Sequence, residues 1–297
     1  MSGAEGGNGK VFKQDLDQEC EFQNVFFIHL LFEDDGPLPS NDAVIKALKA
    51  TFGEADTVAN TEGLSTFAIP EYIVEYADGN KVPAQVLMSN FEEFDHDEID
   101  EMSLSQLWDC VNGREVLSTC RYRLMISDFM ASGLEYEKRC CLLTRWLETA
   151  LEIFPKCTAV WVPSSGKLLR RNQVLSNPCE GDDRFIYWGV NVRFFNVEGT
   201  SDAVVDTLGL YAIGLPDVQY HFHGLDPNAV VNHAYNVASY IFENDVPVKD
   251  GETIDGISEN GIDRSVQWTC HYEMSLIQPR REVMDICPGE FASGNRE

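Results

Sequence analysis

Basic residues are scarce in this sequence. Lys and Arg number 22 against 49 Asp and Glu, which gives a formal net charge of -27. An anionic surface repels nucleic-acid phosphates and anionic lipid headgroups, so we expect no nucleic-acid partner and no membrane partner. No apolar run reaches the roughly 18–20 residues that a membrane-spanning helix needs, which favours the same conclusion.

Closely spaced cysteine pairs are also missing. The chain has nine cysteines, an odd number that includes the adjacent pair Cys140 and Cys141, and it has no C-x-x-C motif. The N-terminal segment MSGAEGGNGK lacks the apolar core of a signal peptide. These features predict a cytoplasmic protein with reduced thiols, without a zinc ribbon, thioredoxin-type chemistry or any other cofactor.

The composition is sufficient for a large core, with 44% hydrophobic residues in 297. Apolar periodicity predicts strands that follow one another in hairpin-like runs, and this favours an α+β fold with mixed, mostly antiparallel sheets and helices on one face. Two related, ferredoxin-like halves are one such arrangement. We expect a flexible tail (1–18), an N-terminal half (19–113), a C-terminal half (114–285) and a second flexible tail (286–297).

Local signals predict several element boundaries. Ser40 is expected to cap a helix, Asp78-Gly79-Asn80 to turn a hairpin, and Asp226-Pro227 to begin a helix. Ser132 and Glu135 have the spacing of a capping box for a helix that ends at Pro155. We further expect a strand over 185–197, a helical run through Arg171, a polar connection over 249–256 and a last strand at 266–274.

The turn at Ser164, Ser165, Gly166 and Lys167 follows a predicted buried strand. It fits neither the P-loop nor the nucleophile-elbow pattern. If a short helix follows the turn, its first backbone N–H groups and the side chains of Lys167, Arg170 and Arg171 could hold an anion. The alternative is a structural turn beside a solvated basic face.

Two histidines, His221 and His223, project from the same side of a predicted strand, because side chains alternate along a strand. Two imidazoles in this position can bind a metal ion if Asp226, His271 or Glu273 provides a third ligand. The alternative is a pair of exposed histidines near a strand end.

Several segments together resemble the family catalogued as domain of unknown function 4261. The similarity is best over about residues 204–275, and it depends on four blocks: Thr207 to Leu210, Gly214 to Val218, the helical segment Asp226 to Phe242, and Val248 to Ile254. The turn from Trp161 to Gly166 resembles an upstream part of longer members. This resemblance implies one compact unit, and it implies no activity, ligand or catalytic residue.

Charge is distributed unevenly along the chain. Acidic residues predominate in the first 120 positions, whereas the segment 121–171 is locally basic. Complementary surfaces of this kind favour a non-enzymatic module that binds a protein partner or a second copy of itself. The alternatives are an enzyme or small-ligand binder with an anion at the Ser164–Lys167 turn, and a metal-binding module that uses His221 and His223.

Overall fold

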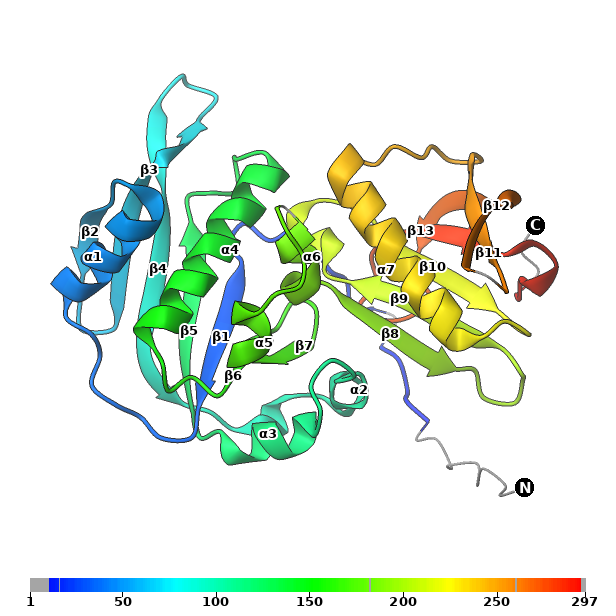
Figure 1. Cartoon of the computed structure of the whole chain (residues 1–297), viewed down its shortest axis with the longest axis horizontal. Helices are drawn as coiled ribbons and strands as arrows, with labels where there is room; N and C mark the ends of the chain where they lie inside the picture. The colour runs from blue at the N-terminus through cyan, green and yellow to red at the C-terminus, as the bar shows by residue number, and fades with distance from the viewer. Residues whose placement is uncertain (1–10, 16, 182, 260, 295–297) are drawn as a thin grey trace.

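The computed structural model describes residues 11–15, 17–181, 183–259 and 261–294 (Figure 1). The first unit runs from residue 27 to residue 170. Its elements are β1 (Phe27–Phe32), α1 (Asn41–Phe52), β2 (Asp56–Asn60), β3 (Leu64–Glu75), β4 (Lys81–Glu93), η1 (His96–Glu98), α2 (Glu101–Ser105), α3 (Gly113–Thr119), β5 (Tyr122–Phe129), α4 (Tyr136–Ile153), β6 (Ala159–Val162) and β7 (Lys167–Arg170).

These strands form a seven-stranded antiparallel sheet in the order β2-β3-β4-β5-β1-β6-β7. Neighbouring side chains of β1 point to opposite faces, and both faces are covered. Leu30 packs in the cluster that includes Leu48 of α1 and Leu147 of α4, whereas Leu31 packs with Leu117 of α3. The prediction of helices on one face is therefore wrong for this sheet.

The second unit follows two short helices, α5 (Arg171–Leu175) and α6 (Asp183–Gly189). Its elements are β8 (Asn191–Asn196), β9 (Ala203–Leu208), η2 (Leu210–Ile213), β10 (Asp217–Phe222), α7 (Pro227–Asn244), β11 (Thr253–Ser258), β12 (Gly261–Met274), β13 (Glu282–Cys287) and η3 (Gly289–Phe291). The six strands have the order β11-β12-β13-β10-β9-β8, and only the β10–β13 pair of this sheet is parallel. The two sheets confirm the α+β class with mostly antiparallel strands.

Helix α7 lies over one face of the second sheet (Figure 1). Its buried residues Val230, Val237 and Ile241 share a cluster with Tyr220 of β10 and Trp268 of β12. The helix begins as its sequence predicts, because the carboxylate of its N-cap Asp226 accepts a hydrogen bond from the backbone N–H of Asn228 at 3.1 Å. None of the described helices has both the length and the apolar character needed to cross a membrane.

The boundary predicted near residue 113 falls inside the first sheet. Strand β5, which follows that position, pairs with β1 and β4, which precede it. The chain passes to the second sheet only between β7 and β8. The two sheets differ in strand number and order, so related ferredoxin-like halves are not seen in the topology.

Both predicted tails have structured residues. In the predicted tail 286–297, β13 extends to Cys287, and Ala292 forms a β-bridge with Phe222. In the predicted tail 1–18, the backbone carbonyl of Gln18 accepts a hydrogen bond from the N–H of Arg280 at 2.8 Å. Residues 1–10, 16 and 295–297 of these predictions lie outside the described residues.

Four local predictions differ from the structure. Helix α4 begins after Glu135 without a side-chain cap, so the Ser132–Glu135 capping box is not formed. Residues 167–170 form β7 rather than a helical run, because they pair with β6 across the turn. The strand expected over 185–197 forms only as β8, because residues 183–189 form α6 instead, and the expected polar connection over 249–256 contains the start of β11.

Candidate functional site

The Ser164–Lys167 turn closes the hairpin between β6 and β7. The backbone N–H groups of Ser165 and Gly166 both donate to the carbonyl of Val162, at 3.2 and 2.9 Å. The hydroxyl groups of Ser164 and Ser165 are buried, and no partner is found for them among the described residues. The two amides that would begin an anion-binding helix are therefore used inside the turn.

The three cations near this turn also have protein acceptors. The ammonium of Lys167 lies 3.0 Å from the carboxylate of Asp109 and donates to the carbonyl of Val190 at 2.7 Å. Arg170 donates to the carbonyl of Val111 at 3.2 Å. Arg171 donates twice to the carbonyl of Leu151 near the end of α4, at 2.9 and 3.1 Å. These contacts use the groups that a bound anion would need.

His221 and His223 lie on β10 and at its end, as the sequence predicts, but they face different partners. The Nε2 atom of His221 is 3.6 Å from a carboxylate oxygen of Asp202. The Nδ1 atom of His223 is 3.1 Å from the hydroxyl of Ser293.

The three residues predicted as a third metal ligand are engaged in other contacts. His271 lies 3.4 Å from Asp250, Glu273 accepts a hydrogen bond from Gln219, and Asp226 caps α7. Within the described part of the chain, the one group with metal-ligand spacing is the segment 95–97 (Asp-His-Asp), two of whose residues are exposed. Among the described residues, His221 and His223 therefore belong to no group with metal-ligand spacing.

A network of buried charges, which no sequence pattern predicted, lies on the second sheet. The guanidinium of Arg281 donates to Asp217 at 2.9 Å and to Asp206 at 2.8 Å. Arg193 forms a two-pronged ion pair with Asp206, at 2.8 and 2.5 Å. All four side chains are almost fully buried.

The hydrogen-bonding groups of this network are well satisfied by neighbouring atoms. Arg281 also donates to the carbonyls of Thr207, Ile277 and Pro279. Asp217 accepts from the hydroxyl of Thr207 and from three backbone N–H groups, those of residues 209, 210 and 211. A substrate cannot reach groups that are buried and whose hydrogen-bonding capacity is already used, so we assign this network a role in stabilising the second unit.

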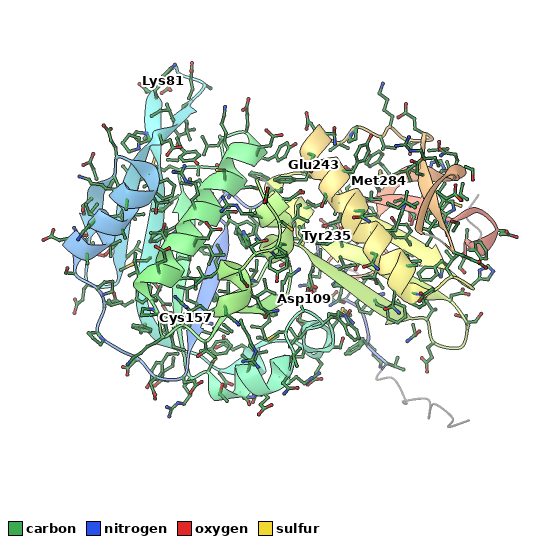
Figure 2. All side chains as sticks on the ribbon, in the orientation of Figure 1. Lys81, Asp109, Cys157, Tyr235, Glu243 and Met284 are labelled. Atoms are coloured by element: carbon green, nitrogen blue, oxygen red, sulfur yellow. The ribbon has the colours of Figure 1, made fainter. Side chains whose placement is uncertain are left out.

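A cavity of about 670 Å³ lies at the junction of the two units. Figure 2 labels two of its residues, Asp109 and Tyr235, in the region between the two sheets. The walls come from the loop after α2, from β7, from the segment containing α6, from β8 and from the first two turns of α7. The lining residues are Trp108, Asp109, Lys167, Pro178, Cys179, Tyr187, Val192, Phe194, Pro227, Asn228, Val231, Asn232 and Tyr235.

One face of α7 forms a wall of this cavity. Asn228, Val231, Asn232 and Tyr235 are spaced at three- and four-residue intervals, which places them on one side of a helix. The hydroxyl of Tyr235 lies 3.6 Å from the sulfur of Cys179. Burial raises the pKa of the Tyr235 hydroxyl, and its contact with Cys179 raises that pKa further, so Tyr235 faces the cavity as a neutral phenol.

Lys167 and Asp109 place a charged pair in the cavity wall. The lysine ammonium lies 5.7 Å from the centre of the Tyr187 ring, in addition to its contact with Asp109. Burial raises the pKa of the Tyr187 hydroxyl, and the negative charge of Asp109 is the next largest cause. The pair thus supplies a localised polar feature in a wall that is otherwise largely aromatic and aliphatic.

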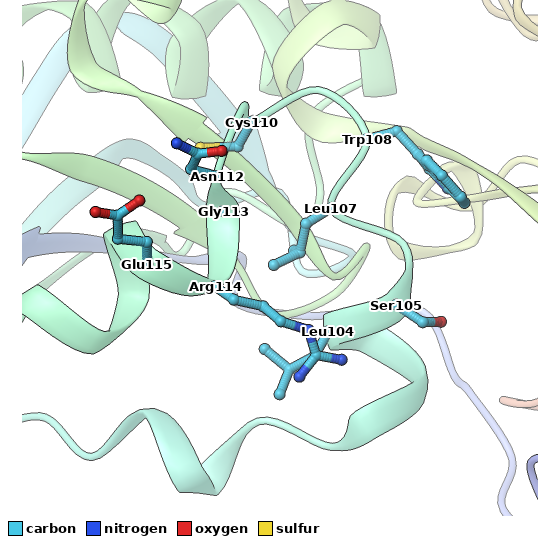
Figure 3. Close-up of a pocket in the computed structure, with 9 residues that line it drawn as sticks. All are labelled: Leu104, Ser105, Leu107, Trp108, Cys110, Asn112, Gly113, Arg114 and Glu115. Carbon is cyan, nitrogen blue, oxygen red and sulfur yellow. The ribbon is translucent and has the colours of Figure 1, made fainter. Parts of the chain in front are cut away.

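Trp108 lies at the boundary of this cavity and of a second one. The second cavity has a volume of about 430 Å³ and is lined by residues 104–115 of the α2–α3 segment. Figure 3 shows the Trp108 ring projecting from the loop, away from Asn112 and Glu115. Its indole N–H donates to the side-chain oxygen of Gln106, which also accepts the backbone N–H of Phe194 in β8. Gln106 therefore links the Trp108 loop to the edge of the second sheet.

Of the residues predicted as ligands, only Lys167 lines the 670 Å³ cavity. The remaining walls come from segments that are far apart in the sequence, and no short motif marks them. The Asp226-Pro227 helix start was the one available signal, because it fixes the helical face that carries Asn228 and Asn232.

Comparison with known families agrees with the resemblance in the sequence. A family model described as domain of unknown function (DUF4261) matches residues 206–287. The matched segment extends from the middle of β9 to the end of β13, so it contains the α7 wall of the cavity together with Asp206, Asp217 and Arg281. No curated protein and no solved structure matches the chain.

Proposed function

We propose that this protein binds a small organic molecule in the cavity at the junction of its two units. The observation that supports this proposal best is the cavity itself, which has a volume of about 670 Å³. Ligand sites are typically clefts of roughly 300–1,000 Å³ that lie between domains, with mostly apolar walls and a few placed polar groups. The aromatic walls and the Asn228, Asn232 and Lys167–Asp109 polar groups fit this description.

The polar groups of the cavity are suited to orienting a ligand. Asn228 and Asn232 lie one helical turn apart and can each donate and accept a hydrogen bond. Tyr235, on the same face of α7, and the neighbouring Cys179 add a phenol and a thiol. The side chains of Trp108, Tyr187 and Phe194 supply flat apolar surfaces, which bury a planar ligand efficiently.

One specific observation supports the predicted role in protein binding. Trp108 and Val111 are 62% and 75% exposed, and both lie on the loop between α2 and α3. Exposed aromatic residues are frequent anchors in protein interfaces. We propose protein binding at this loop as the second candidate function, with Trp108 shared between partner and ligand.

We also propose that the protein resides in the cytoplasm. The nine cysteines are free thiols, and six of them are buried: Cys110, Cys120, Cys140, Cys157, Cys270 and Cys287. Burial raises the pKa of Cys157 and of Cys270 to about 12, so both are neutral packing groups at physiological pH. A reducing compartment preserves such thiols.

Ligand-observed NMR of the full chain with a library of small aromatic fragments tests ligand binding. The variant Val231→Trp places a large ring on the α7 wall and should abolish the saturation-transfer signals that the wild-type protein gives. Val58→Trp is the matched control, because Val58 is 52% exposed on β2, outside the cavity. Signals that persist unchanged in Val231→Trp, or no signal from any fragment with wild-type protein, would refute the proposed site.

A further inference from the structure

The ion pair in the cavity wall presents its two charges unequally. The side chain of Lys167 is only 5% exposed, whereas that of Asp109 is 47% exposed. The ammonium is enclosed by the carboxylate of Asp109, the carbonyl of Val190 and the face of Tyr187. A ligand in the cavity therefore meets the carboxylate of this pair more readily than the ammonium.

The aromatic residues of the cavity add negative electrostatic potential. The faces of Trp, Tyr and Phe rings attract cations, with Trp the strongest. The Tyr187 ring already lies near the ammonium of Lys167, which leaves Trp108, Phe194 and Tyr235 as the other ring surfaces of the wall. The negative charge of Asp109 also contributes to the raised pKa of Tyr187 and of Tyr235, so its electrostatic field extends to both of these lining residues.

The features that could attract an anion are neutralised. Lys167 is the only Lys or Arg among the lining residues, and its charge is paired with Asp109. The first turn of α7 also borders the cavity, and the partial positive charge of a helix start can hold an anion. Here the carboxylate of Asp226 occupies that position, because it accepts the N–H of Asn228 at 3.1 Å. The formal net charge of -27 likewise favours approach by cations.

We infer that the ligand of this cavity is an organic cation, an ammonium group on an aromatic body, with the ammonium at Asp109 and the aromatic body between Trp108 and Tyr235. This inference rests on the proposed ligand-binding function and specifies its chemical class. Asn228 and Asn232 then hydrogen-bond polar atoms of the ligand body from the α7 wall.

Three indoles that differ only in the charge of their side chain test the inference. Tryptamine is a cation at neutral pH, tryptophol is neutral and indole-3-acetate is an anion. Isothermal titration of the full chain should give tryptamine an affinity about three- to fivefold above that of tryptophol, in line with about 1 kcal/mol for an ion pair with the half-exposed carboxylate of Asp109. Indole-3-acetate should bind more weakly than both.

The variant Asp109→Asn should abolish the preference for tryptamine over tryptophol. Asp97→Asn, an exposed substitution outside the cavity, is the matched control and should retain the preference. If Asp109→Asn does not fold, the order of the three affinities in the wild-type protein alone decides whether the ligand is a cation. Equal affinities, or a preference for indole-3-acetate, would overturn the cation inference and leave the cavity function standing. Failure of all three indoles and of the whole fragment library would instead refute the proposed function.

Discussion

Replacement of Arg281 by Met should destabilise the second unit strongly. The guanidinium is fully buried and donates five hydrogen bonds, two to carboxylates and three to backbone carbonyls. Met fills most of the side-chain volume but donates none of them. The carbonyls of Thr207, Ile277 and Pro279 lose a donor, and Asp217 loses the charge that compensates its own.

The loss in free energy of unfolding can be estimated from the contacts of Arg281. Removal of one partner from a buried ion pair typically costs about 3–5 kcal/mol, and a stable domain has about 5–15 kcal/mol in total. Asp206 keeps its pair with Arg193, so we expect the loss to fall within that range rather than above it. The variant should therefore lose a substantial part of the free energy of unfolding of this unit.

Urea denaturation followed by circular dichroism measures this loss. The control is Lys138→Met, which breaks an exposed pair with Glu135 and should leave the unfolding midpoint unchanged. The double variant Arg281→Met with Asp217→Asn should lose less free energy than the two single variants added together, because the carboxylate charge is also removed. A midpoint for Arg281→Met equal to that of Lys138→Met would refute the assignment of this network to stability.

Three further predictions follow from particular residues. Gly209→Ala should lower the free energy of unfolding by more than about 2 kcal/mol, because φ of Gly209 is +142° and a Cβ atom there would lie 2.5 Å from the carbonyl oxygen of Gly189. Gly251→Ala should lower it less, because φ of Gly251 is +79° and no atom lies within 4 Å of the added Cβ. Urea denaturation of both variants measures the difference. Burial, and after it the nearby Arg123, lowers the pKa of His29 from 6.5 to about 4. The contribution of His29 to stability should therefore be complete above about pH 6.5 and decrease as the pH falls toward about 4. In thermal denaturation, His29→Gln should make the melting temperature depend less on pH over this range. An equally steep decrease in the variant would contradict the assignment of this pH dependence to His29. Trp108→Ala should weaken fragment binding without changing the melting temperature, since the ring is 62% exposed; a drop of several degrees would show a structural role instead.

Elements with strong local signals could be predicted from the sequence. Helix α7 begins at Asp226-Pro227 because an N-cap carboxylate and a proline at the first helical position act within one turn. The Ser40 cap of α1 and the turn at Asp78-Gly79-Asn80 depend on local geometry in the same way. Such features do not need tertiary contacts to be specified.

Segments whose conformation depends on packing could not be predicted in this way. Residues 185–188 (Phe-Ile-Tyr-Trp) form an apolar run that fits a buried strand or a short helix, and the helix is chosen where Phe185 and Trp188 pack against Phe26. Lys167 was expected at a helix start, but pairing with Val162 makes it the first residue of a strand. That strand turns its ammonium toward Asp109.

Most of the candidate site could not be predicted from the sequence, for a related reason. The cavity combines positions 108–109, 167, 178–194 and 227–235, which meet only after both sheets have formed. The buried network is equally non-local, since Arg193 and Arg281 are separated by most of the second unit. Neither arrangement leaves a spacing pattern that a single sequence could reveal.

A crystal structure of the full chain soaked with its strongest-binding small molecule tests the central claim most directly. The account predicts that the molecule lies in the cavity at the junction of the two units, with atoms within about 4 Å of Tyr235 on α7 and of Trp108 on the loop after α2. A molecule bound elsewhere, with this cavity empty, would contradict it.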